Sequence, residues 1–87
     1  MKKIDLYSKD YCAYCHRAKE LLDIKGVRYN EIDVTYDNNL ESEMQQRSGQ
    51  LTVPQVFIDN QHVGGCSDLF TLDEKGELDL LLSQCSA

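Results

Sequence analysis

The chain has 87 residues, a formal net charge of -6 and a hydrophobic content of 41%, which suits one domain over residues 1–87 and excludes two separate cores. The acidic balance argues against a nucleic-acid partner, because phosphates attract basic surfaces. No apolar run approaches the roughly 20 residues of a membrane helix, and the first residues lack the apolar core of an export signal. We therefore expect a cytoplasmic protein with neither a membrane nor a nucleic-acid partner.

The first part of the chain predicts a strand, a helix and a second strand. Ile4 and Leu6 alternate with polar neighbours, as in a short strand. A helix is expected over 13–25, where apolar side chains recur at helical spacing. Residues 27–34 predict a second strand, and their apolar positions change phase, which indicates that both faces are covered.

The second part predicts a polar helix, a β-hairpin and two short helices. Asn38 and Glu41 have the spacing of a capping box that would begin the polar helix. Strands over 56–58 and 62–63 flank turn-prone residues, and leucines at helical spacing follow them, the last group over 78–82. The predicted order is βαβαββα plus a short C-terminal helix. This order implies an α/β protein with a four-stranded mixed β-sheet flanked by helices.

Cys12 and Cys15 lie at the start of the first expected helix and carry the main chemical signal. Side chains three residues apart on a helix are neighbours, so the two thiols can close a disulfide. Cys15 continues the buried face, whereas Cys12 precedes the first turn and should face solvent. A helix N-terminus favours a thiolate, and Lys9 adds a positive charge nearby. We therefore expect Cys12 to be the nucleophile and Cys15 the resolving thiol in thiol–disulfide exchange.

Two other classes of protein also use closely spaced cysteines. A zinc site needs two further ligands, but the remaining cysteines and histidines include no second closely spaced pair. The run from Cys12 to His16 matches the attachment motif of c-type haem. Haem attachment, however, usually accompanies export, and a mixed fold that begins with a strand is unsuited to enclosing a porphyrin. Redox chemistry without a metal site is the favoured interpretation.

Three motifs together resemble the glutaredoxins, in particular the small bacterial glutaredoxins of dithiol type. They are Cys12 to His16, Thr52-Val53-Pro54 and Gly64 to Asp68, in the family's order and spacing over almost the whole chain. The resemblance implies a thioredoxin-like fold in which the peptide bond before Pro54 is cis and Val53 lies beside the active cysteines. It also implies a glutathione-dependent oxidoreductase that reduces glutathione mixed disulfides and protein disulfides, with no permanently bound cofactor.

The resemblance further implies where glutathione lies. Its peptide backbone would pair with that of Val53 like an added strand. Basic residues would meet a carboxylate at one end, and the helix start at Ser67 and Asp68 would hold the γ-glutamyl group at the other. The expected substrate-binding residues are Lys9, Tyr14, Arg47, Thr52, Val53, Pro54, Ser67 and Asp68.

Ala13 departs from the family, because many dithiol glutaredoxins have Pro at this position. Ala restores a backbone N–H in the first helical turn, and relatives without this Pro include some that bridge an iron–sulfur cluster between two subunits with glutathione. Cluster carriage is therefore the alternative function, although dedicated carriers typically have a single active cysteine and this chain keeps Cys15.

The expected partners of a monomer are glutathione and glutathionylated or disulfide-bonded proteins, with a reductase such as ribonucleotide reductase as one candidate. Cys66 is expected to be a small buried residue near the site. Cys85 is expected to be a tail thiol without a catalytic role. His16 and His62 are expected on the surface.

Overall fold

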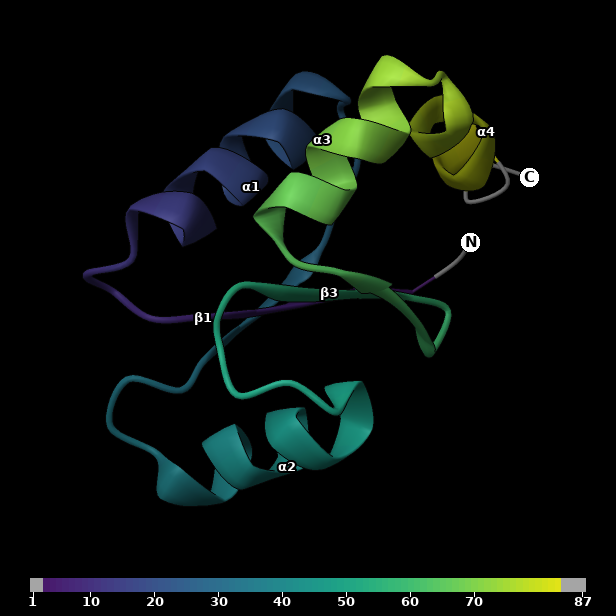
Figure 1. Cartoon of the computed structure of the whole chain (residues 1–87). Helices are drawn as coiled ribbons and strands as arrows, with labels where there is room; N and C mark the ends of the chain where they lie inside the picture. The colour runs from purple at the N-terminus through teal and green to yellow at the C-terminus, as the bar shows by residue number, and fades with distance from the viewer. Residues whose placement is uncertain (1–2, 84–87) are drawn as a thin grey trace.

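A mixed β-sheet lies between two layers of helices (Figure 1). The computed structural model describes residues 3–83, so Cys85 lies outside the described residues. The elements are β1 Ile4–Ser8, α1 Ala13–Ile24, β2 Asn30–Asp33, α2 Asn38–Ser48, β3 Gln55–Ile58, β4 Gln61–Gly64, α3 Cys66–Glu74 and α4 Glu77–Ser83. This is the predicted order. Within residues 3–83, no helix has both the length and the apolar character needed to cross a bilayer.

The strand order is β2-β1-β3-β4, and β1 is parallel to β2 but antiparallel to β3. β3 and β4 form the predicted antiparallel hairpin. Asp59 and Asn60 connect them with φ angles of 55° and 68°. Two consecutive positive φ values are the signature of a type I′ turn, which matches the twist of the flanking strands. The predicted mixed sheet is confirmed.

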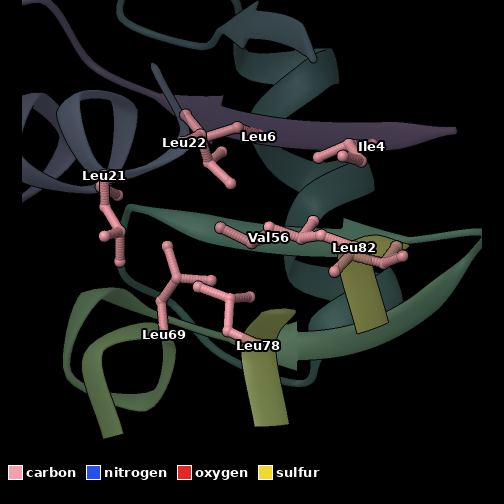
Figure 2. Packing of buried hydrophobic residues seen from close by; sticks show 10 residues of the cluster. Ile4, Leu6, Leu21, Leu22, Val56, Leu69, Leu78 and Leu82 are labelled. Carbon is pink, nitrogen blue, oxygen red and sulfur yellow. The ribbon is translucent and has the colours of Figure 1, made fainter. Parts of the chain in front are cut away.

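The larger hydrophobic core lies on the face of the sheet that α1, α3 and α4 cover (Figure 2). Ile4, Leu6 and Val56 project from the strands toward leucines of these three helices. A side chain of this size contributes about 1.5–3 kcal/mol when it is fully buried. This core fixes the position of α1, and therefore the position of the cysteine pair at its start.

The smaller core lies on the opposite face, under α2, and consists of Tyr7, Val34, Met44 and Phe57. Because α2 covers this face, β1 is buried on both sides, and even Asp5 is only 2% exposed. The alternation of apolar and polar residues in β1 would suit a strand with one wet face. The structure instead buries Asp5 and Tyr7, the positions between the apolar ones, against α2.

One predicted strand boundary and one predicted helix cap were wrong. β2 begins at Asn30 rather than at residue 27, because its pairing with β1 starts at Asp5 opposite Asn30. The cap of α2 is Asp37 rather than Asn38, since the Asp37 carboxylate accepts the N–H groups of the second and third helical residues at 3.0 Å each. An aspartate can satisfy these otherwise unpaired N–H groups.

Candidate functional site

A cleft of about 590 Å³ lies where the loop before β3 meets the start of α3. Six of the predicted substrate-binding residues line it. They are Tyr14, Thr52, Val53, Pro54, Ser67 and Asp68. The structure thus brings together side chains from three separate segments of the chain. Cys12 contacts one of them, the loop before β3, since its Sγ lies 3.8 Å from the carbonyl oxygen of Val53.

Cys12 is the N-cap residue of α1 and has an extended backbone conformation. Its Sγ accepts a hydrogen bond from the backbone N–H of Cys15 at 3.1 Å. Cys12 is half-buried rather than fully buried, which leaves it open to a substrate disulfide. A helix N-terminus that donates an N–H to sulfur stabilises negative charge there. The geometry is therefore suited to a nucleophilic thiolate.

Cys15 lies three residues further along α1 and is fully buried. Burial, followed by a hydrogen bond with the Cys12 side chain, raises the pKa of the Cys15 thiol to about 12. Both cysteines are free thiols in this structure. The predicted difference in exposure between the two cysteines is confirmed. At neutral pH, Cys15 keeps its proton, and it is a weak nucleophile until that proton is removed.

The peptide bond between Val53 and Pro54 is cis, as the resemblance implied. Gly65 passes close to this turn, and Gly64 passes close to the side chain of Asp68, so an added Cβ atom would be crowded at both positions. A Cβ atom at Gly65 would lie 3.2 Å from the carbonyl oxygen of Pro54, and one at Gly64, where φ is +130°, would lie 2.7 Å from Cβ of Asp68. Gly65 thus lets the start of α3 approach the loop before β3, and Gly64 lets the chain turn into α3 beside Asp68.

The start of α3 forms one wall of the cleft. The carboxylate of Asp68 accepts the backbone N–H of Gly65 at 3.0 Å, which is half of a capping interaction. Ser67 and Asp68 are both exposed to the cleft. The unpaired N–H groups of a helix N-terminus favour an anion, so this wall is suited to a carboxylate of a bound molecule.

Lys9 and Arg47 are the two predicted substrate-binding residues that do not line the cleft. Lys9 forms an ion pair with Glu41 at 2.7 Å, and this hydrogen bond raises the pKa of Lys9. Arg47 lies under the sheet, where its guanidinium donates to the hydroxyl of Tyr7 at 2.8 Å and stacks 4.0 Å from the ring centre of Phe57. Their role in substrate binding stays a prediction.

Several residues line the cleft that the sequence reasoning did not assign to substrate binding. The side chains among them are Gln50, Gln55, His62 and Cys66. Cys66 is buried as expected, and burial raises the pKa of its thiol. His62 is exposed as expected, yet it also lines the cleft. Its place in the hairpin opposite β3 was a usable signal, because a residue across from the strand that follows Pro54 must lie near this turn.

No group of three or more His, Cys, Asp or Glu side chains is placed to hold a metal ion within residues 3–83.

Comparison with known proteins identifies the family. The glutaredoxin family model matches residues 4–63. Glutaredoxin 3 of Escherichia coli K12 is 51% identical over 82 residues, which cover 94% of this chain and 99% of that protein. A buckwheat glutaredoxin–glutathione complex has a TM-score of 0.89 at 36% identity and covers 99% of this chain and 81% of its own. Brucella melitensis glutaredoxin has a TM-score of 0.82 at 50% identity and covers 92% and 87%, respectively. The chain therefore belongs to the glutaredoxins, a family of glutathione-dependent thiol oxidoreductases with a thioredoxin-like fold.

Proposed function

We propose that this protein reduces glutathione mixed disulfides and protein disulfides, with Cys12 as the nucleophile and Cys15 as the resolving thiol. The observation that carries the proposal is the contrast between the two sulfurs. Cys12 is accessible and receives an N–H from the helix start, whereas Cys15 is buried with a pKa of about 12. Cys12 is thus suited to the first nucleophilic attack, and Cys15 is suited to act after it.

In the glutathione route, the Cys12 thiolate attacks the glutathionyl sulfur of a mixed disulfide. The bond between that sulfur and the target breaks, and the target leaves as a thiolate that takes up a proton. A second glutathione thiolate then attacks the glutathionyl sulfur on Cys12, which forms glutathione disulfide and restores the Cys12 thiolate.

In the dithiol route, the Cys12 thiolate attacks a protein disulfide and forms a mixed disulfide with the target. Cys15 then loses its proton and attacks Sγ of Cys12, which releases the second target thiol and leaves a disulfide between Cys12 and Cys15. Two glutathione molecules reduce this disulfide and become glutathione disulfide. The high pKa of Cys15 is consistent with this order, because Cys15 acts only after Cys12 has reacted.

Glutathione would lie in the cleft with its backbone paired to that of Val53. Thr52, Pro54 and Tyr14 would line its path. The γ-glutamyl carboxylate would meet the N–H groups at the start of α3 near Ser67, and the γ-glutamyl amine would meet the carboxylate of Asp68. The buckwheat relative forms a complex with glutathione, which supports this proposal.

Lys9 and Arg47 remain candidates for the other glutathione carboxylate, but each would have to exchange its present acidic or aromatic partner for the ligand. Residues 1–87 would act as one domain and as a monomer, with glutathione as the electron donor and glutathionylated or disulfide-bonded proteins as targets.

The test is turnover of a glutathionylated small thiol by the purified protein in excess glutathione. We expect fast turnover that Cys12→Ser abolishes and Cys15→Ser retains, whereas reduction of a protein disulfide is lost in both variants. Cys85→Ser, the same chemical change in a cysteine that we assign no catalytic role, is the matched control.

Equal loss of the glutathione route in Cys12→Ser and Cys15→Ser would contradict the division of roles. Absence of turnover in the unmodified protein would contradict the proposed function itself. In that case, brown colour after anaerobic reconstitution with iron, sulfide and glutathione would support the cluster-carrier alternative.

A further inference from the structure

Gln55 is a polar residue buried at the start of a central strand, directly after the cis-proline turn. It is the first residue of β3 and is only 3% exposed. Its side chain lies on the same face of the strand as Phe57, since alternate residues of a strand share a face. Burying an amide is costly unless hydrogen bonds satisfy both its ends. The partners of Gln55 therefore show what the amide does.

Both ends of the Gln55 amide have partners at the cleft. Its Nε2 donates to the carbonyl oxygen of Thr52 at 3.0 Å. The amide nitrogen therefore faces Thr52, and the Gln55 Oε1 faces Nε2 of His62 at 2.7 Å. Since that oxygen can only accept, Nε2 of His62 carries the proton. The three residues form a hydrogen-bonded chain that runs from His62 through Gln55 to Thr52.

His62 is held in place for this interaction. It lies opposite Phe57 in the hairpin register, and the two rings are 5.0 Å apart between centroids. A ring packed against its cross-strand neighbour loses less freedom when it forms a hydrogen bond. His62 therefore supports Gln55 from β4. Thr52 lies before β3 and outside the sheet, so its carbonyl oxygen accepts a hydrogen bond from the Gln55 side chain instead of from a neighbouring strand.

The hydrogen bond from Gln55 to the Thr52 carbonyl also orients the peptide unit that joins Thr52 to Val53. In a trans peptide unit, the carbonyl and the N–H point in opposite directions, and among the described residues the cis bond follows Val53 rather than preceding it. Because Gln55 holds the Thr52 carbonyl, the Val53 N–H points away from Gln55. A hydrogen bond to the carbonyl also polarises the unit and makes its N–H a stronger donor.

We propose that Gln55 and His62 are positioning residues that aim the Val53 N–H at the peptide backbone of glutathione. This inference rests on the proposed function, because it assigns a purpose to the backbone of Val53 in that site. The Cys12 sulfur lies 3.8 Å from the Val53 carbonyl oxygen. The backbone of Val53 would therefore set the distance between the bound tripeptide and the nucleophilic sulfur. A substrate without peptide groups gains nothing from this arrangement.

The experiment compares two disulfides in single-turnover reactions with the reduced protein, namely glutathione disulfide and the peptide-free disulfide of 2-mercaptoethanol. Gln55→Met keeps the side-chain volume but removes both hydrogen bonds. We expect the second-order rate constant for glutathione disulfide to fall about fivefold to tenfold, the equivalent of one hydrogen bond. The rate constant for the peptide-free disulfide should change less than about twofold, because it needs no contact with the Val53 N–H.

A second variant, His62→Phe, keeps the ring against Phe57 and removes the donor. It alters an exposed residue, so it carries the test even if Gln55→Met does not fold. We expect a smaller but selective loss with glutathione disulfide, of about twofold to threefold, because Gln55 is still present. Gln46→Met, the same change at an exposed residue of α2, is the matched control. The double variant should react like Gln55→Met alone, since residues of one hydrogen-bonded chain are not additive.

Equal losses with both disulfides would overturn the inference, because they would show a general structural defect rather than positioning of a peptide. An unchanged rate constant for glutathione disulfide in either single variant would also overturn it. An extra loss in the double variant would overturn the indirect role of His62 and show direct contact with substrate. If the unmodified protein does not prefer glutathione disulfide to the peptide-free disulfide, the proposed glutathione site itself fails.

Discussion

The difference between the two active-site thiols predicts how they react with an alkylating reagent. Only the thiolate is alkylated at an appreciable rate. Burial and the hydrogen bond with Cys12 raise the pKa of Cys15 to about 12, so at pH 8 the thiolate fraction of Cys15 is on the order of one in ten thousand. Cys12 is accessible and receives the N–H of Cys15. Iodoacetamide should therefore modify Cys12 long before Cys15.

The assay is alkylation of the reduced protein with a substoichiometric amount of reagent, followed by mass spectrometry that separates the cysteine-containing peptides. The Cys15 rate should rise about tenfold per pH unit between pH 8 and 10, because its ionised fraction grows tenfold while the thiol remains far below its pKa. A Cys15 rate within about tenfold of the Cys12 rate at pH 8 would refute the reasoning. A Cys15 rate that does not change with pH would refute it equally.

Two further predictions concern stability. Met44→Ala should reduce the free energy of unfolding, measured in urea, by about 2–4 kcal/mol, because Met44 is fully buried in the core under α2. The control is Gln46→Ala, on the exposed side of α2. A loss in Met44→Ala no larger than in this control would contradict the prediction. Gly64→Ala should lower the urea midpoint and slow turnover, because φ is +130° and the new Cβ would lie 2.7 Å from Cβ of Asp68. Wild-type stability in Gly64→Ala would show that the start of α3 can move away freely.

Local sequence was sufficient to predict the order of the elements and the place of the cysteine pair. In a helix that follows Cys12 and carries Cys15 on its apolar stripe, packing of that stripe buries Cys15 and leaves Cys12 at the edge of the packed face. The turn residues Asp59 and Asn60 likewise specify the hairpin through their own backbone preferences. These features depend on residues a few positions apart, which is why periodicity and turn chemistry predicted them.

Only the tertiary structure decided which polar residues are buried and what they hold in place. Asp5 is buried under α2, where Arg47, 42 positions away, and Asn30 donate to its carboxylate. Gln55 is buried because Thr52 and His62 satisfy its amide from two other segments. Periodicity predicts the apolar face of a strand, but the burial of a polar side chain depends on distant partners that only the fold brings within hydrogen-bonding distance.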